Sequence, residues 1–219
     1  MMDFINSNKI VKQIAAIARK ENIQAFLVGG YVRDKLLGKQ DTDIDITIIG
    51  NAIDFAEKTA ESLNTQLAAV YDKFGTALLS LANFENENEP IKIEFASARK
   101  ESYRKDSRKP IVEFSDLKDD LSRRDFTVNA LAVSLNDDKN DIVDYFGGQK
   151  DLKDKILRTP FEPYKTFDDD PLRIMRACRF ASQLGFIIAS ETFEAMKQMR
   201  ERLKLTDDKP TVVSQERIT

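Results

Sequence analysis

The chain has 219 residues, 42% of them hydrophobic, and its 34 Lys and Arg against 37 Asp and Glu give a net charge of −3. This length is enough to bury a core, and the charge balance excludes a protein whose whole surface binds nucleic acid, because phosphate neutralisation needs clustered cations. With no His and a single Cys, the chain cannot use His-based acid–base catalysis or Cys and His zinc sites, so carboxylates, Arg and Lys must carry any chemistry.

Nothing in the sequence predicts secretion, a membrane partner or an oligomeric state. No apolar run approaches the ~18 residues of a membrane span, and the N-terminus lacks the basic, apolar and small-residue pattern of a secretory signal. The single Cys178 has no second Cys with which to form an internal disulfide. We therefore expect a cytoplasmic protein.

Hydrophobic spacing near the N-terminus predicts alternating helices and strands. Apolar residues at helical spacing over 8–20 precede a short apolar run at Ala25–Val28, which is typical of a buried strand. A short helix at Tyr31–Leu37 then leads to a strand at Ile44–Ile48, in which isoleucines alternate with polar residues. A helix near 51–63 follows.

The middle of the chain predicts further strands and two polar loops. Strands are expected at Ala77–Leu81 and Ile91–Phe95, joined by an acidic surface loop at 83–90. The segment 99–109 is strongly basic and without periodicity, so we predict a mobile loop there and regard it as a candidate for local phosphate contact. After Asp125 we expect the start of a helix. Two apolar runs follow at Leu131–Leu135 and Ile142–Asp144, and then a glycine turn at Gly147–Gly148.

From about residue 151 the pattern becomes helical. Asp170–Pro171 opens one helix, since Pro is tolerated in a first helical turn; a second covers about 190–204, and a third starts near Ser214. Because the sequence stops there without a stop signal, we expect a longer protein. The predicted fold is α+β, with a head of residues 1–150 built on a small mixed sheet flanked by helices, and an all-α neck of residues 151–219.

Three carboxylates are the candidate metal ligands. Asp43 and Asp45 are two apart on a predicted strand and so point to the same face, and Glu94 turns outward on a neighbouring predicted strand. Three acids on one face repel one another unless cations lie between them, and a two-metal site for phosphoryl transfer needs that arrangement. The sequence therefore predicts catalytic carboxylates that bind Mg²⁺. The alternative is a polar junction between a loop and a strand.

A glycine pair is the candidate triphosphate site. Gly29 and Gly30 follow a predicted strand and precede a helix, where backbone N–H groups and the positive helix end favour phosphate, and Arg33 lies one turn further. The pattern lacks the glycine spacing of a dinucleotide-binding fingerprint, so a nicotinamide-binding protein is disfavoured.

Several motifs, in order, resemble the class II tRNA nucleotidyltransferase and poly(A) polymerase family of the DNA polymerase β-like superfamily. The segment Leu27–Asp34 with Asp41–Asp45 resembles its G-G-x-V-R-D…D-x-D motif. The segment Arg123–Ala130 is similar to its R-R-D-F-x-x-N-A motif for ribose and triphosphate. The segment Asp169–Arg173 resembles its E-D-x-x-R nucleotide template, with Asp in place of Glu at the first position, and Val213–Ile218 resembles the start of its neck motif.

The resemblance makes one helix the protein template for base selection. Asp170, Arg173, Arg176 and Arg179 recur at steps of three and form a polar stripe, for which the alternative is a solvated helix face. If the stripe faces the site, Asp170 accepts from an exocyclic amine and Arg173 donates to a ring nitrogen or carbonyl. Cytosine and adenine present that order of donor and acceptor, whereas uracil and guanine reverse it, so CTP and ATP are favoured.

The resemblance also implies the remaining roles and the activity. It assigns Arg124 to the triphosphate, Asp125 with Asn129 to the ribose, and Arg176 and Arg179 to base support or phosphates. The implied reaction adds CMP and AMP from CTP and ATP to the 3′ end of tRNA, without a nucleic-acid template and with two Mg²⁺ ions. Poly(A) addition, partial CC or A addition, and a catalytically idle RNA- or nucleotide-binding module are the alternatives.

Overall fold

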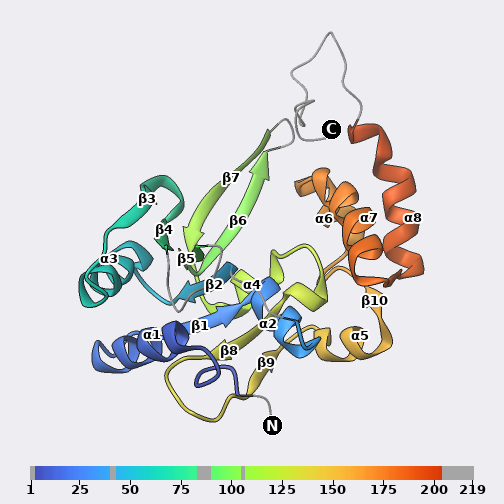
Figure 1. Cartoon of the computed structure of the whole chain (residues 1–219). Helices are drawn as coiled ribbons and strands as arrows, with labels where there is room; N and C mark the ends of the chain where they lie inside the picture. Colours follow the sequence, from blue (N-terminus) through green and yellow to red (C-terminus); the bar gives the residue numbers. More distant parts are fainter. Residues whose placement is uncertain (1–2, 40–42, 83–89, 105–106, 204–219) are drawn as a thin grey trace. The chain divides into compact units, whose positions relative to one another are not determined.

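The computed structural model describes residues 3–39, 43–82, 90–104 and 107–203 (Figure 1). The chain divides into two compact units. The sheet unit comprises Met1–Arg99, Phe114–Asp120 and Leu131–Tyr145, and the helical unit comprises Lys100–Glu113, Leu121–Ala130 and Phe146–Thr219. Chain segments therefore alternate between the units, while the division into a head and a neck at residue 150 stays a prediction about domains.

A seven-stranded mixed sheet forms the centre of the sheet unit. Its order across the sheet is β3 (Leu67–Tyr71), β4 (Thr76–Leu81), β5 (Ile91–Ser97), β2 (Asp43–Ile48), β1 (Ala25–Val28), β8 (Leu131–Ser134) and β9 (Ile142–Asp144). Only β2 and β5 pair in parallel among these described strands; every other neighbouring pair is antiparallel. The predicted mixed sheet is confirmed.

Helices cover the sheet in the predicted places: α1 (Lys9–Lys20), α2 (Gly29–Leu36) and α3 (Ala52–Ser62). The Asn8 and Asn51 side chains start α1 and α3 by accepting hydrogen bonds from backbone N–H groups of the first turn. An ion pair of 2.6 Å between Lys58 Nζ and Glu21 Oε2 joins α3 to the end of α1, so the two helices lie side by side (Figure 1).

Alternation along the strands gives the sheet a core face and a polar face. Ile44, Ile46 and Ile48 of β2 are at most 1% exposed and belong to the hydrophobic core, together with side chains of α1 and α3. Because successive side chains of a strand point to opposite faces, Asp43 and Asp45 lie on the other face. The burial of the isoleucines therefore fixes which way the acidic side chains point.

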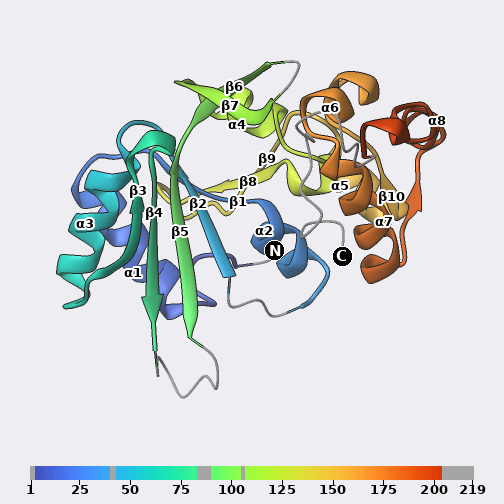
Figure 2. The same ribbon diagram turned by 90° about the horizontal axis from the view of Figure 1, so that it is seen from above.

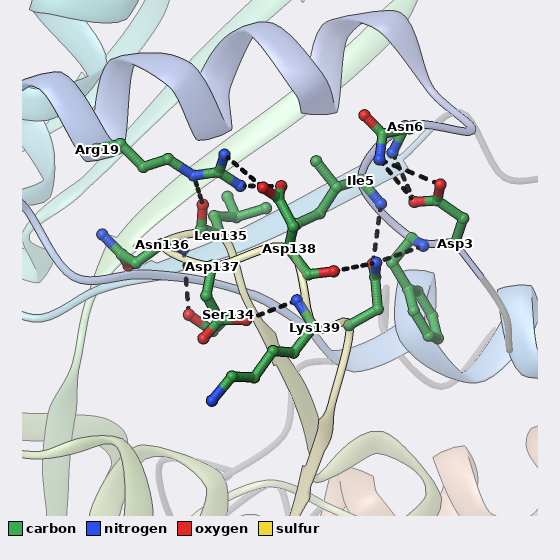
Figure 3. Close-up of polar contacts among 12 residues, drawn as sticks. Asp3, Ile5, Asn6, Arg19, Ser134, Leu135, Asn136, Asp137, Asp138 and Lys139 are labelled. Carbon is green, nitrogen blue, oxygen red and sulfur yellow. Dashed lines mark hydrogen bonds and ion pairs between the residues drawn. The ribbon is translucent and has the colours of Figure 1, made fainter.

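The N-terminal residues are tied to the turn between β8 and β9 (Figure 3). Asn140 Oδ1 accepts from the backbone N–H groups of Phe4 and Ile5 at 2.9 and 3.3 Å. Arg19 on α1 pairs with Asp138 of the same turn at 2.6 Å. These contacts hold α1 beside the turn between β8 and β9. The candidate site lies on other strands, β2 and β5.

Helices make up most of the helical unit from residue 146 onward (Figure 2). In chain order after the short helix η3 (Thr127–Asn129) come α5 (Gly148–Asp154), α6 (Pro163–Asp169), α7 (Leu172–Leu184), α8 (Ser190–Met199) and η4 (Arg200–Leu203). The two-residue strands β10 (Ile156–Leu157) and β11 (Ile187–Ile188) pair in parallel. The helices predicted from Asp170 and over 190–204 are confirmed, and the pair of short strands is an addition to the predicted all-α segment.

One predicted loop is wrong. The basic segment 99–109 was expected to lack regular structure, but it forms β6 (Arg99–Arg104) and part of β7 (Ser107–Phe114), which pair with each other as a two-stranded sheet. The strands run in opposite directions (Figure 1). The basic sequence of this segment shows no hydrophobic alternation, which explains the error.

Other elements were not predicted or lie outside the described residues. The edge strand β3, the short helix η1 (Asp72–Phe74) and α4 (Leu117–Ser122) were not predicted. The helix expected near Ser214 and most of the acidic loop over 83–90 fall outside the residues that the structure describes. None of the described helices combines the length and apolar character that crossing a membrane requires.

Candidate active site

Strands β2 and β5 place two of the predicted acids opposite each other. In their parallel pairing Asp45 is the partner of Glu94, and Asp43 is the partner of Lys92. Paired residues of neighbouring strands point to the same face, and Ile44 between the two aspartates is only 1% exposed on the opposite face. Asp45 is half-buried, whereas Asp43 and Glu94 are exposed. The predicted acids therefore share the polar face of the sheet.

The donor chemistry of this face fits a hard cation such as Mg²⁺, which prefers carboxylate oxygens. Asp45 and Glu94 are in register, and Asp43 lies two residues along the same face. Within the described part of the chain, no group of three or more His, Cys, Asp or Glu lies close enough to hold a metal ion. The structure thus brings Asp45 and Glu94 together, and the site of three carboxylates stays a prediction.

A fourth carboxylate lies under the same strand. Asp120, from α4, is completely buried and accepts a hydrogen bond of 3.2 Å from Thr47 Oγ1. Thr47 is itself 1% exposed and follows Asp45 by two residues on the same face of β2. The sequence analysis missed this pair. The alternation that pointed to Asp45 also predicts the direction of Thr47, but no sequence signal connects Thr47 to Asp120, 73 residues away.

The glycine pair forms the start of α2. Gly29 has a φ of +70°, a conformation that favours glycine, and α2 begins without a capping side chain because residue 28 is Val. Arg33 is 8% exposed and donates from Nε to Asp34 Oδ1 at 3.0 Å, with a second contact between Nη2 and Oδ2. Arg33 is thus held by Asp34, and contact of Gly29, Gly30 and Arg33 with a triphosphate stays a prediction.

In the helical unit, Asp125 is the centre of a network. Its Oδ1 accepts from Asn129 Nδ2 and from the backbone N–H of Phe126, both at 2.9 Å. Its Oδ2 accepts from Nε and Nη2 of Arg176 at 2.7 and 2.6 Å. Asp125 is 7% exposed, and Arg124 directly before it is half-buried. The structure brings together the predicted ribose residues and joins them to a residue of α7.

A second buried carboxylate supports the same segment. Asp151 on α5 is 2% exposed, accepts from Thr127 Oγ1 at 2.6 Å and pairs with Arg158 at 2.7 Å. The backbone N–H of Thr127 also donates to the carbonyl oxygen of Arg158 at 2.8 Å. Asp151 and Arg158 therefore fix the segment two residues beyond Asp125. Sequence reasoning missed both, since their pairing appears only in three dimensions.

The four residues of the predicted stripe of α7 make different contacts. Asp170 lies just before α7, and its Oδ1 accepts from the backbone N–H of Leu172 at 3.1 Å. Arg173 Nη2 donates to the carbonyl oxygen of Arg123 at 2.7 Å. Arg176 and Arg179 are both exposed, but only Arg176 pairs with Asp125, as described above. Three of the four stripe residues therefore make specific contacts within the helical unit, which a purely solvated face would lack.

The family is decided by a match over the segment that contains the glycine pair, the three acids and Arg123–Ala130. Residues 25–158 match the family described as the poly A polymerase head domain. The chain belongs to this family. The resemblance predicted from the ordered motifs is confirmed, as is the fold class.

Two curated relatives agree with the family. The A-adding tRNA nucleotidyltransferase of Aquifex aeolicus is 44% identical over 177 residues, which are 80% of this chain and 20% of the relative. The CCA-adding enzyme of Bacillus pumilus is 40% identical over 182 residues, which are 82% of this chain and 42% of the relative. The chain thus spans less than half the length of either relative.

Solved structures share the fold. A Thermotoga maritima CCA-adding enzyme complexed with tRNA is 37% identical, with a TM-score of 0.72 over 88% of this chain and 42% of that protein. A CCA-adding enzyme without ligand is 39% identical, with a TM-score of 0.75 over 86% of this chain and 42% of that protein. The fold of this chain therefore resembles that of solved CCA-adding enzymes, in agreement with the family match of its sequence.

Proposed function

We propose that this poly A polymerase head protein adds CMP and AMP, from CTP and ATP, to the 3′ end of tRNA. The observation that carries the proposal is the register of Asp45 and Glu94 on the polar face of a sheet with this family's fold. The A-adding relative is named for tRNA, a CCA-adding enzyme of similar structure was solved with tRNA, and the chain covers part of each. We also propose a cytoplasmic location, because a single cysteine cannot form the internal disulfides typical of secreted proteins.

The proposed reaction is a phosphoryl transfer. The 3′ oxygen of the RNA bonds to the α-phosphorus, the bond to the bridging oxygen breaks, pyrophosphate leaves, and the hydroxyl proton passes to solvent. Divalent metal ions are a general feature of nucleotidyltransferases; here Asp43, Asp45 and Glu94 would hold Mg²⁺, which when bound would lower the pKa of the hydroxyl and neutralise the leaving group. The protein's own contribution is to orient the nucleotide and exclude the wrong base.

Residues of the helical unit supply that orientation in the proposal. Arg124 contacts the triphosphate, and Asp125 with Asn129 contacts the ribose. Asp170 and Arg173 read the pairing edge of the base, with the acceptor and donor order that suits cytosine and adenine. The anchoring of Arg173 on the carbonyl oxygen of Arg123 supports this, because a template side chain must be held in one position to discriminate.

Addition of A alone is a second candidate. Relatives from Aquifex aeolicus and Geobacter sulfurreducens, 44% and 37% identical, are both named A-adding tRNA nucleotidyltransferases. Because the residues that read the base edge suit both cytosine and adenine, the nucleotide-selecting motif alone does not separate the two products. The distinction depends on the product formed with tRNA.

Product analysis tests the proposal. A tRNA transcript that ends before its CCA sequence, and one that ends in CC, are incubated with the chain, Mg²⁺, CTP and ATP, and their 3′ ends are sequenced. Addition of CCA to the first supports the leading proposal, and A added only to the second supports the second candidate. A long A tract indicates poly(A) addition. No transfer by wild type, or equal transfer by Asp45→Asn, contradicts the proposal.

A further inference from the structure

We infer that Arg176 determines the preference for ribose over deoxyribose by positioning Asp125, and that it does not read the base or the phosphates. The inference rests on the proposed function, because it takes Asp125 as the group that meets the 2′-hydroxyl of the nucleotide. It gives Arg176 a role different from the one that its place in the α7 stripe implies.

The geometry at Asp125 supports a positioning role. Nε and Nη2 of Arg176 both donate to Oδ2 of Asp125, at 2.7 and 2.6 Å. The opposite oxygen is fixed by Asn129 and by the backbone N–H of Phe126. A carboxylate with both oxygens held has one orientation, and without Arg176 only one oxygen would remain held. Charge-assisted bonds of this kind are the strongest hydrogen bonds in proteins, so Arg176 is the main restraint on Oδ2.

The surroundings of Arg176 keep its guanidinium on Asp125. Its Cζ lies 5.2 Å from the centroid of the Phe180 ring, and that ring is 7% exposed and packs edge-on against Phe126, with 5.9 Å between the centroids. Phe126 follows Asp125 in the chain, so the aromatic contact and the ion pair connect the same two segments. The Arg176 side chain is 43% exposed, but a move of its guanidinium to a ligand would break its contacts with both the carboxylate and the ring.

A 2′-hydroxyl can donate a hydrogen bond to a carboxylate, and a deoxynucleotide lacks that bond. The resulting difference in affinity depends on a carboxylate fixed at the position of the hydroxyl. If the Asp125 carboxylate is free to turn toward solvent, the nucleotide gains less from its hydroxyl. Removal of Arg176 therefore weakens discrimination between sugars more than it changes discrimination between bases.

Arg179 provides a matched control. It lies one step further along the same stripe, and its Cζ is 5.0 Å from the centroid of the same Phe180 ring. Asp125, however, has only Phe126, Asn129 and Arg176 as hydrogen-bond partners among the residues that the structure describes. Arg176→Ala and Arg179→Ala therefore remove the same charge and a contact with the same ring, but only the first releases Asp125.

The test is calorimetric titration of the chain with CTP and with dCTP in Mg²⁺. We measure the ratio of the two dissociation constants for wild type, Arg176→Ala, Arg179→Ala, Asp125→Asn and the double variant Arg176→Ala with Asp125→Asn. The ratio should fall about tenfold in Arg176→Ala, the effect of one charge-assisted hydrogen bond. It should stay at the wild-type value in Arg179→Ala, even if both affinities fall. The double variant should show no further fall beyond Asp125→Asn.

Each other outcome is decisive. A wild-type ratio in Arg176→Ala, with a lowered ratio in Asp125→Asn, overturns the inference and leaves the ribose role of Asp125 intact. Wild-type ratios in both variants overturn that role as well. A fall in Arg176→Ala equal to that in Arg179→Ala assigns the effect to charge alone and also overturns the inference. Absence of nucleotide binding by the folded wild type contradicts the proposed function itself. Thermal unfolding of each variant confirms that the compared proteins are folded.

Discussion

Asp45 and Glu94 are direct partners across β2 and β5, in the parallel pairing that the described sheet contains. Two acids in register on one face repel each other, and protein stability alone gives no reason for this arrangement. A cation between them turns the repulsion into attraction. The pair is therefore the feature of the sheet unit that is most directly explained by phosphoryl-transfer chemistry.

The first prediction concerns that pair. Asp45→Asn should reduce nucleotide addition by more than about a hundredfold, since loss of groups that only support metal ligands already costs up to that much. Transfer assays measure the activity, and thermal unfolding in metal-free buffer confirms that the variant is folded. The control Asp54→Asn makes the same change in an exposed first turn of α3 and should alter neither. An active Asp45→Asn variant would rule out the catalytic role.

A second prediction concerns the buried carboxylate beneath β2. Thr47→Val removes the hydroxyl that donates to Asp120, so the fully buried carboxylate loses a partner. The free energy of unfolding should fall by about 1 to 3 kcal/mol. Thr59→Val is the control: its equally buried hydroxyl donates only to the carbonyl oxygen of Phe55, one turn earlier in α3. Denaturant unfolding should show a smaller loss for Thr59→Val; equal losses would argue against a special role for the contact with Asp120.

A third prediction concerns the support of the ribose segment. Arg158→Met removes the cation that pairs with Asp151, whose side chain is 2% exposed while that of Arg158 is 46% exposed. The partial exposure of the arginine screens the pair, so we expect a loss of about 1 to 3 kcal/mol, below the value for a fully buried pair. Urea unfolding measures it. Lys150→Met, which breaks the exposed pair with Asp154, should cost less than Arg158→Met, because solvent screens an exposed pair. Equal effects would show that burial of Asp151 does not matter.

A fourth prediction is a pH dependence at the α1–α3 contact. The hydrogen bond and charge of Lys58 lower the pKa of Glu21, and Glu21 raises the pKa of Lys58. A carboxyl group whose pKa is lowered by folding stabilises the folded state above its unfolded pKa, and this stabilisation is lost as pH falls through its folded pKa. The stabilisation from Lys58, whose pKa is raised, is lost instead as pH rises through its folded pKa. Lys58→Met should therefore be less stable than wild type at neutral pH, and the two should converge in acid. A pH-independent difference in unfolding temperature would contradict the assignment.

Local patterns predicted the parts of the fold in which one face is buried. The isoleucines of β2 and the apolar stripe of α1 gave the right element types because their burial has a period that the sequence displays. Strand β3 was not predicted, because an edge strand with exposed Val70 and Tyr71 has no such contrast. The basic segment 99–109 was not predicted as strand because its sequence shows no hydrophobic alternation.

The candidate site was predicted as a set of residues but not as a set of contacts. The motifs identified Asp125 and Arg176 separately, yet the ion pair between them joins residues 51 apart in the chain. Asp151 and Arg158 were missed because a buried carboxylate is recognised only when its partners are known. The register of Asp45 with Glu94 likewise depends on the parallel pairing of two strands with two others between them in the sequence.

The most direct test is titration of the chain with CTP, ATP, UTP and GTP in Mg²⁺, repeated on Asp170→Asn. This change keeps an oxygen for the backbone N–H of Leu172, so α7 can start as before, but replaces an acceptor with an amide donor. We predict tighter binding of CTP and ATP than of UTP and GTP by wild type, and loss of that preference in the variant. Equal binding of all four nucleotides by wild type, or an unchanged preference in Asp170→Asn, would contradict selection of the base by this protein.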